Sequence, residues 1–498
     1  MATTKNKAYA TNPEEFTSEY FESIKGNHAA LRQFFTAMPK GGDVHNHLTG
    51  SAYAETYFEL AAKKGMYVNL ETGKLYKEKP EGVETIQLSK EMDDLHNHRM
   101  TLIDKWSIRN FQPYKYPLGP DEYFFGTFGL LSALTSDIDD LAYLMHELKV
   151  RAVRENIQYL EVIGIAPHIP EKCFLGDKYD EKDRELKKNV KEGNFVQLRQ
   201  KLVEILDLFK ESEEVEKVVD DYDKSIRMLD KKSETFESHF IRGGKIVCRY
   251  QGYAVRNLEP IMVFAQMYVV FNACLKENWG NLLTGCNIVA AENGEKSMMY
   301  YMAHMLMFAV LKDHFKEQNK FVNVSLHAGE LTLGLVRPEH LTYHIQRAAD
   351  LHIANRIGHG VDLPFEEVDN NNVIYYMKEY DMAVEINLTS NEFILGVKGS
   401  EHPIMLYHNA GVPIIISTDD PGILRTSLTE QYTLATLRYG FSYSEIKQFV
   451  HNSIKYAFLT DKEKQDLFTE LRMHFNSFEK KYEKLFRQPE ERCAETTD

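Results

Sequence analysis

Residues 412–421 read Val-Pro-Ile-Ile-Ile-Ser-Thr-Asp-Asp-Pro, a short apolar run that ends in two acidic residues. Such a continuous apolar run is typical of a parallel strand that is buried on both faces. The same order, a β-branched run, then polar or glycine residues, then a helical pattern, recurs along the chain. We therefore predict eight strands, over residues 42–47, 157–165, 245–250, 285–291, 322–327, 356–359, 382–388 and 412–418.

Helical patterns lie between these strands, at 135–156, 260–276 and 295–312. Eight strands that alternate with helices predict an α/β fold, a (β/α)8 TIM barrel. The surplus length predicts a short helical extension over residues 1–37, before a barrel over 38–498 with helical insertions at about 65–120 and 170–243. In the second insertion Leu198, Leu202 and Phe209 repeat at helical spacing and should pack, whereas residues 211–237 are rich in charge and predict a solvated helix.

Composition limits the partners and the compartment. The 498 residues carry 59 Lys and Arg against 74 Asp and Glu, a formal net charge of −15, so binding to a nucleic acid polymer is not expected. The N-terminus has no apolar segment typical of a signal peptide, and the longest apolar run, 261–275, is too short to span a bilayer. Five scattered cysteines without a C-x-x-C pair indicate reduced thiols. We expect a cytoplasmic protein with no membrane partner.

Polar residues follow several of the predicted strands at the end where barrel enzymes place their active sites. The first strand ends in His45-Asn46-His47, and strand alternation turns both imidazoles to the same side. The fifth, sixth and eighth strands contribute further candidates at this rim: His327, Glu330, His359, Asp419 and Asp420. The sequence therefore predicts one cluster of His and carboxylate side chains.

Three histidines and one carboxylate are a donor set that suits a single zinc ion, with an open position for water. Zinc would lower the pKa of that water to near 7. Glu330 is a candidate general acid, since Gly329 allows the chain to turn back over the site. His359 lies between glycines and can orient the water. Asp419 and Asp420 are adjacent, so one can bind the metal while the other faces the substrate.

Five segments resemble the adenosine deaminase family of the amidohydrolase superfamily and occur in that family's order. They are Met38-Pro-Lys-Gly-Gly-Asp-Val-His-Asn-His-Leu-Thr-Gly-Ser51, Ser325-Leu-His-Ala-Gly-Glu330, Arg356-Ile-Gly-His-Gly360, Glu385-Ile-Asn-Leu-Thr-Ser-Asn391 and Ile416-Ser-Thr-Asp-Asp-Pro421. Two further segments are most similar to the adenosine-deaminase-related growth factor branch, Glu401-His-Pro403 and Asn452-Ser-Ile-Lys-Tyr456.

The resemblance implies a role for each candidate residue. Zinc, one ion per chain, would be held by His45, His47, His327 and Asp419. Glu330 would donate a proton to N1 of adenine, His359 would position the attacking water, and Asp420 would accept a hydrogen bond at N7. The implied reaction is zinc-dependent hydrolytic deamination of adenosine and 2′-deoxyadenosine to inosine with release of ammonia, a step of purine metabolism with a small purine nucleoside as partner.

The chain differs from the family pattern at positions that contact the substrate in the short deaminases. The short deaminases carry Asp after His-Leu, where it contacts the ribose 5′-hydroxyl, and Thr49 stands there in this chain. They also carry a Gly at the end of the fourth strand, where Glu292 is nearest and Gly294 follows two residues later. We expect Thr49, Glu292 and Gly294 to bind substrate, which leaves 5′-modified adenosine, AMP or another aminopurine as alternatives.

Other interpretations stay open. A binuclear amidohydrolase needs a bridging Lys at the end of the fourth strand, where the first Lys is Lys296. An AMP deaminase needs cations at the rim, for which Arg425 and Lys398 are candidates. A binding protein or growth factor on an inactive barrel is a third interpretation, against which the complete metal and acid set argues. One more hypothesis is an apolar lid over the purine, or else ordinary packing, made by Phe111, Tyr114, Tyr116, Tyr123, Phe124, Phe125 and Phe128.

Overall fold

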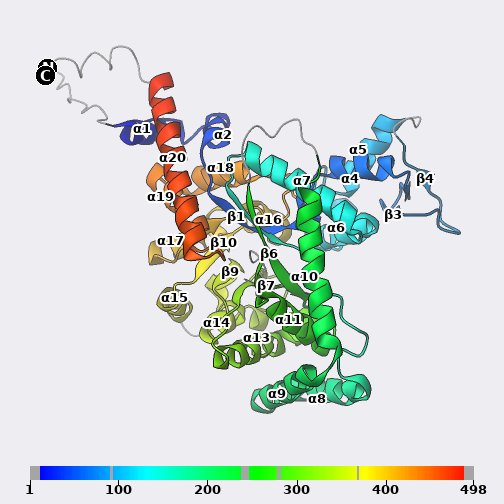
Figure 1. The fold of residues 1–498 in the computed structure, drawn as a ribbon. Coiled ribbons are helices and arrows are strands. Elements are labelled where there is room, and N and C mark those ends of the chain that lie inside the picture. Colours follow the sequence, from blue (N-terminus) through cyan, green and yellow to red (C-terminus); the bar gives the residue numbers. More distant parts are fainter. Residues whose placement is uncertain (1–11, 90–93, 237–245, 277–281, 367–369, 487–498) are drawn as a thin grey trace, which may run out of the picture.

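The computed structural model describes residues 12–89, 94–236, 246–276, 282–366 and 370–486 (Figure 1). Its main sheet has eight strands whose neighbours pair in parallel and follow chain order. The strands are β1 (Gly42–His47), β5 (Tyr159–Ile163), β6 (Val247–Val255), β7 (Leu283–Val289), β8 (Asn323–Ala328), β9 (Arg356–His359), β10 (Ala383–Ile386) and β11 (Ile414–Ile416). The predicted TIM barrel is confirmed. Lys245, the predicted start of the third strand, lies outside the described residues.

The last and first strands meet at the rim that carries the candidate site. An isolated parallel bridge joins Asn46 to Asp419. The backbone N–H of His47 donates to the carbonyl of Asp419, and the N–H of Asp419 donates to the carbonyl of His45, both at 2.9 Å. The chain thus joins two of the predicted ligand segments by backbone hydrogen bonds.

Helices surround the barrel between successive strands (Figure 1). Those on the N-terminal half are α3 (Leu48–Ser51), α4 (Ala54–Lys63), α6 (Pro120–Thr135), α7 (Ile138–Arg154) and α11 (Pro260–Cys274). Those on the C-terminal half are α12 (Glu295–Met299), α13 (Tyr301–Glu317), α14 (His344–Asp350), α15 (Asn370–Glu379), α16 (Leu388–Leu395), α17 (Ile404–Ala410), α18 (Leu428–Tyr439), α19 (Tyr443–Lys455) and α20 (Asp461–Phe486). The predicted helical segments 135–156, 260–276 and 295–312 coincide with α7, α11 and α12–α13.

The N-terminal extension holds two helices, α1 (Pro13–Ile24) and α2 (His28–Ala37), where the sequence indicated only the second. Residues 1–11 lie outside the described residues. Phe21 and Phe34 are fully buried, and the Phe34 ring lies 5.8 Å from that of Tyr443 and 5.2 Å from that of Phe478. The extension therefore shares one hydrophobic core with the C-terminal helices α19 and α20.

The second insertion contains α8 (Tyr179–Lys191), α9 (Phe195–Glu211) and α10 (Glu214–Ser233). The expectation that residues 211–237 form a solvated helix is wrong, because α10 lies along α7 and α11 (Figure 1). Val219, Tyr222, Ile226 and Leu229 are buried on one face of α10. Their spacing of three or four residues is the amphipathic signal, which the surrounding Lys, Glu and Asp obscure in the sequence.

The first insertion forms a small antiparallel sheet followed by a helix. The sheet has the order β3 (Leu75–Tyr76), β2 (Tyr67–Val68), β4 (Ile86–Gln87), and the helix is α5 (Leu95–Lys105). Trp106 is buried and its indole N–H donates to the carbonyl of Gly73 at 2.7 Å, which fastens the sheet to the helix.

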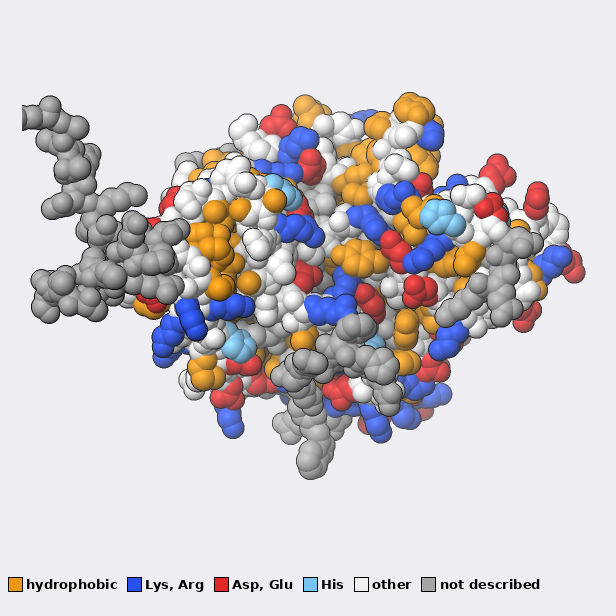
Figure 2. All heavy atoms as spheres, turned by 90° about the horizontal axis from the view of Figure 1, so that it is seen from above, with side chains coloured by type: hydrophobic (Ala, Val, Ile, Leu, Met, Phe, Trp, Pro, Cys, Tyr) orange, Lys and Arg blue, Asp and Glu red, His pale blue; other side chains and the backbone are white. Residues whose placement is uncertain are grey.

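Surface charge and helix hydrophobicity are the two features that bear on binding to nucleic acids or membranes. The face in Figure 2 mixes acidic and basic side chains and shows no continuous basic band. Within the described ranges, no helix combines the length and the apolar character that a membrane span requires. The four described cysteines are free, and Cys493 lies outside the described residues.

Candidate active site

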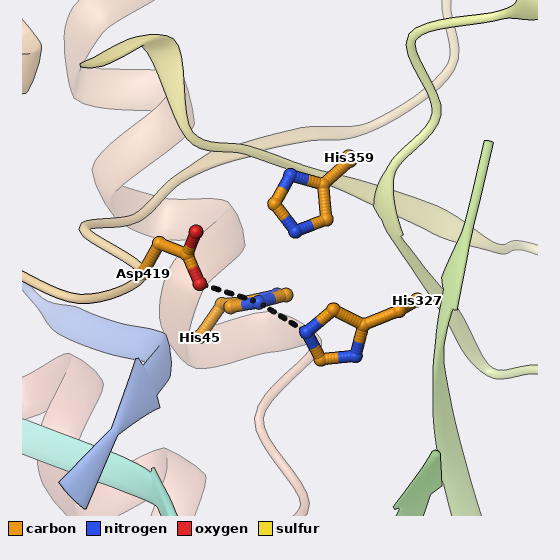
Figure 3. Close-up of side chains that lie close together, drawn as sticks. All are labelled: His45, His327, His359 and Asp419. Carbon is orange, nitrogen blue, oxygen red and sulfur yellow. Dashed lines mark hydrogen bonds and ion pairs between the residues drawn. The ribbon is translucent and has the colours of Figure 1, made fainter. Parts of the chain in front are cut away.

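Side-chain atoms of four residues converge at the C-terminal rim of the barrel, from β1, β8 and the turn after β11: His45, His47, His327 and Asp419. Figure 3 shows three of them, His45, His327 and Asp419, together with His359. Nε2 of His327 lies 3.1 Å from Nε2 of His45 and 3.0 Å from Nε2 of His47. Oδ1 of Asp419 lies 3.4 Å and 3.3 Å from the same two nitrogens. These four distances are short enough for the four atoms to share one ion at the Zn–N distance of about 2.0 Å. The sequence prediction named these four residues. A second group, His45, His327, His359 and Asp419, also offers ligand atoms within 4.8 Å of one another.

Hydrogen bonds to residues outside the cluster fix which ring nitrogen of His45 and His327 faces into it. Nδ1 of His45 donates to the carboxylate of Glu385 at 2.6 Å, and Arg356 donates to the same carboxylate. Nδ1 of His327 donates to Oδ1 of Asn287 at 2.9 Å. When both rings are neutral, Nδ1 carries the hydrogen and the two Nε2 atoms present lone pairs to each other. Two facing lone pairs repel unless a cation lies between them, so this donor set fits a metal ion.

The charges around the cluster also favour a cation. Burial disfavours protonated His45, but Asp419 and Glu385 outweigh burial and raise its pKa to about 10, so a proton is favoured at this ring and a metal ion would have to displace it. Burial, with the neighbouring His45 and His47 rings, lowers the pKa of His327 well below its usual value, so that ring stays neutral. Burial would raise the pKa of Asp419, but its hydrogen bonds with His45 and His47 hold it well below the usual range. A carboxylate and neutral imidazoles are the forms that bind zinc.

His359 points into the same space from the end of β9 (Figure 3). A chain of hydrogen bonds sets its tautomer. The backbone N–H of Ile404 donates to Nδ1 of His402 at 3.1 Å, so Nε2 of His402 carries the hydrogen and donates to Oδ1 of Asn391 at 3.0 Å. Nδ2 of Asn391 then donates to Nδ1 of His359 at 2.9 Å. His359 therefore carries its hydrogen on Nε2, a buried atom with no hydrogen-bond partner among the described residues.

Glu330 reaches the site through a turn at Gly329, whose φ of +77° lies in the left-handed region that favours glycine. Its carboxylate Oε1 lies 3.7 Å from Nδ1 of His359. Burial, and next the negative charges of Asp419 and Glu292, raise the pKa of Glu330 well above its usual value. This shift favours the protonated carboxyl group, which is the form that can donate a proton.

Asp420 follows the ligand residue Asp419 and differs from it in its surroundings. Burial, and next the charge of Asp419, raise the pKa of Asp420 well above its usual range. Its Oδ1 is buried and has no hydrogen-bond partner among the described residues. The pKa shifts of the two acids therefore run in opposite directions, and they favour the charged form of Asp419 and the protonated form of Asp420.

The cluster lies at one end of a cavity of about 350 Å³, a volume typical of small-ligand sites. Thr49 lines this cavity, together with Phe124, Phe125 and Phe128 from α6. The other four aromatic residues of the hypothesised lid are not part of the lining: Phe111, Tyr114, Tyr116 and Tyr123. The apolar wall over the site is therefore made by α6 alone among these candidates.

Glu292 does not line the cavity, contrary to the prediction that it binds substrate. Its buried carboxylate accepts hydrogen bonds from the backbone N–H groups of Gly329 and Glu330, at 3.2 and 2.8 Å, and lies 2.6 Å from Nδ1 of His344. Glu292 thus supports the turn that carries the candidate acid Glu330.

Gly294 also lies outside the lining, since it caps the N-terminus of α12. In this loop the cavity is lined by Ala290 and Ala291. Ala290 has a φ of +85°, which is strained for a residue with a Cβ and is usual for glycine. The position at which the family pattern leads one to expect glycine is therefore occupied by Ala290.

The cations that the alternative interpretations require do not line the cavity. Each forms an ion pair elsewhere: Lys296 with Glu259 at 2.5 Å, Arg425 with Glu55 at 2.6 Å and Lys398 with Glu392 at 2.9 Å. No Lys or Arg is found in the described cavity lining. A binuclear centre with a bridging Lys and a phosphate-binding rim both lack support.

The structure is a (β/α)8 barrel whose rim carries a group of side chains that could hold a metal ion. Known proteins with similar sequences or folds indicate the family. The model of the adenosine deaminase family matches residues 270–474. The adenosine deaminase of Shewanella loihica is 30% identical over 162 residues, which are 32% of this chain and 45% of that relative. The match spans less than half of the relative's length.

Two solved structures share the fold over most of both chains. The N6-methyl-AMP deaminase of Arabidopsis thaliana is 19% identical with a TM-score of 0.55, over 89% of this chain and 98% of that one. An amidohydrolase of Burkholderia ambifaria with bound zinc is 17% identical with a TM-score of 0.51, over 90% of this chain and 94% of that one. The predicted resemblance to the adenosine deaminase family is confirmed.

Proposed function

We propose that this protein is a zinc-dependent hydrolase that deaminates adenosine and 2′-deoxyadenosine to the corresponding inosines and releases ammonia. The observation that carries the proposal is a set of four donor atoms beside Glu330, a residue whose pKa burial raises well above its usual value. In this set, Nε2 of His327 and Oδ1 of Asp419 each lie 3.0 to 3.4 Å from Nε2 of His45 and Nε2 of His47. The family match and the zinc bound in the Burkholderia ambifaria amidohydrolase support the choice of reaction and metal.

The proposed reaction is a balanced exchange at C6 of the purine. Water supplies the oxygen that bonds to C6, the C6–N bond breaks, and the amino group leaves as ammonia. When bound by His45, His47, His327 and Asp419, zinc would lower the pKa of a water molecule to near 7. Glu330, protonated through burial, would donate its proton to N1 and so make C6 more electrophilic.

His359 and Asp420 would orient the two reactants. The Nε2–H of His359 has no partner within the described residues and would donate to the attacking water. N7 of adenine bears no hydrogen, so the sequence-based role of Asp420 as acceptor is revised. With its raised pKa, Asp420 would hold a proton and donate it in a hydrogen bond to N7.

A nucleotide is the second candidate substrate, since the Arabidopsis thaliana neighbour is an N6-methyl-AMP deaminase. The lining of this cavity opposes that candidate, because its described side chains include no Lys or Arg to neutralise a phosphate. We therefore favour an uncharged nucleoside.

The test measures the change in ultraviolet absorbance when an aminopurine becomes a hydroxypurine. Zinc-loaded protein is assayed with adenosine, 2′-deoxyadenosine, 5′-methylthioadenosine, AMP and adenine. Turnover of the nucleosides with little turnover of AMP is the expected result. Absence of turnover on all five compounds would overturn the proposed function.

A further inference from the structure

A second cavity of about 690 Å³ adjoins the candidate active site. Thr49 and Tyr253 line both cavities, so these two side chains lie where the cavities are adjacent. Its far wall is formed by α10, the helix of the second insertion that packs on α7 and α11. A ligand that extends beyond the first cavity at Thr49 would enter a space built by this insertion.

The orientation of a purine nucleoside directs its sugar away from the metal. The carbon that loses the amino group, C6, must lie at the cluster formed by His45, His47, His327 and Asp419. The sugar is attached at N9, on the other ring of the purine, and C5′ is the exocyclic carbon of that sugar. A substituent on C5′ is therefore the part of the substrate best placed to pass Thr49 and Tyr253.

The second cavity combines an apolar wall with separated charges. Ile138, Leu141 and Val218 contribute apolar side chains to its lining. Lys217 and Asp221 also line it, one turn apart on α10, a spacing at which opposite charges usually pair. Within the described part of the chain, however, neither of these two side chains has an ion-pair partner. Both charges are available to a ligand.

The charged side chains that line the second cavity indicate which substituent on C5′ it would bind. Lys217 is accompanied by two carboxylates in the lining, Glu214 and Asp221. One ammonium against two carboxylates disfavours a phosphate, which carries only negative charge. A group that bears both an ammonium and a carboxylate would find an opposite charge for each. An apolar chain between that group and the sugar would be covered by Ile138 and Val218.

We propose that the second cavity binds a 5′ substituent consisting of an apolar chain that ends in an α-amino acid. This inference rests on the proposed function, because the metal end fixes the direction of the nucleoside. Lys217 pairs with the carboxylate of the substituent, and Asp221 pairs with its ammonium. The preferred substrate is then an adenosine whose C5′ is joined, through a thioether or a similar link, to a chain that ends in an α-amino acid.

The test compares kcat/KM for adenosine, 5′-methylthioadenosine, AMP and S-adenosylhomocysteine, which carries such a chain. Roughly tenfold higher kcat/KM for S-adenosylhomocysteine than for adenosine is expected from two partly exposed ion pairs and the buried chain. Lys217→Met and Asp221→Asn should each remove most of this preference and leave kcat/KM for adenosine unchanged. Lys224→Met, on the same helix but outside the cavity lining, serves as the matched control.

Binding is a second readout that does not depend on turnover. The deaminated product, S-inosylhomocysteine, should inhibit adenosine turnover more strongly than inosine does, and Lys217→Met should abolish that difference. Equal kcat/KM for S-adenosylhomocysteine and 5′-methylthioadenosine would overturn the amino-acid assignment while the proposed function stands. Preference for AMP would overturn it as well. No turnover of any nucleoside would overturn the proposed function and this inference with it.

Discussion

The two ends of the substrate cavity are built by different means. At the metal end, each reactive side chain lies at a strand end or in the turn after it, and a buried partner fixes it, as Glu385 fixes His45 and Asn391 fixes His359. At the far end, the walls come from α6 and from α10, and the charged residues Lys217 and Asp221 are unpaired among the described residues. If the proposed function and the proposed 5′ site are correct, the barrel strands supply the chemistry and the helices between strands select the substrate.

The largest effect should come from removing a metal ligand. Asp419→Ala is expected to lose bound zinc and turnover together, since the variant lacks one of the four proposed ligands and its carboxylate charge. Elemental analysis of the purified variant and the absorbance assay check this. Asp420→Asn is the control, which should keep zinc while kcat falls. Full zinc content in Asp419→Ala would show that the metal end has been assigned to the wrong side chains.

The next effect concerns the general acid. Glu330→Gln should keep one zinc per chain and lower kcat about 10²–10⁴-fold, because the amide cannot donate a proton to N1. Side-chain volume is preserved, so the comparison isolates the proton. Turnover close to that of the parent protein would exclude Glu330 as the acid.

A smaller effect should follow from disturbing the partners of His359. Asn391→Asp keeps the shape but cannot donate to Nδ1, so the hydrogen of His359 moves from Nε2 to Nδ1. We expect kcat to fall roughly ten- to a hundredfold, with KM and zinc content unchanged. His402→Gln can still donate to Asn391 and should retain more activity than His402→Leu. His304→Gln, at a fully buried histidine outside the cavity lining, controls for general destabilisation.

An equal fall in kcat for His304→Gln and Asn391→Asp would mean that the hydrogen-bond chain has no specific role. A rise in KM without a change in kcat would likewise contradict the assigned tautomer.

The smallest effect is expected at the apolar wall. Phe124→Ser and Phe125→Ser should raise KM for adenosine about tenfold through loss of apolar contact, while kcat changes little. Phe111→Ser, which removes an aromatic residue outside the lining, is the matched control. Unchanged KM in both wall variants would show that α6 does not cover the purine.

The sequence was sufficient for the parts that depend on strand ends. Runs such as Val412–Ile416 identify buried strands, and the polar residues that follow them must meet at one rim once the barrel closes. His45, His47, His327 and Asp419 are therefore predictable from local pattern and topology together. The outer partners are not, because Asn287 and Glu385 meet their histidines only through the register of the sheet.

The loop after β7 and the second insertion show what local pattern misses. From the sequence, the position that corresponds to the family's glycine was assigned to Glu292 or Gly294. In the structure, the residue of this loop that lines the cavity with a glycine-like φ of +85° is Ala290. A positive φ on alanine leaves no mark in the sequence. In α10, the buried stripe that includes Tyr222 is spaced correctly for a packed helix, but the many charged neighbours favoured a solvated interpretation.

The assigned metal site is tested most decisively by the position and number of metal ions in a crystal of zinc-loaded protein, measured by anomalous diffraction at the zinc edge. Ligand atoms of His359 and Asp420 lie close enough to the cluster to compete, within 4.8 Å of other ligand atoms. We predict one zinc per chain, bonded to His45, His47, His327 and Asp419. Two zinc ions, or one bonded to His359 in place of His47, would contradict this assignment.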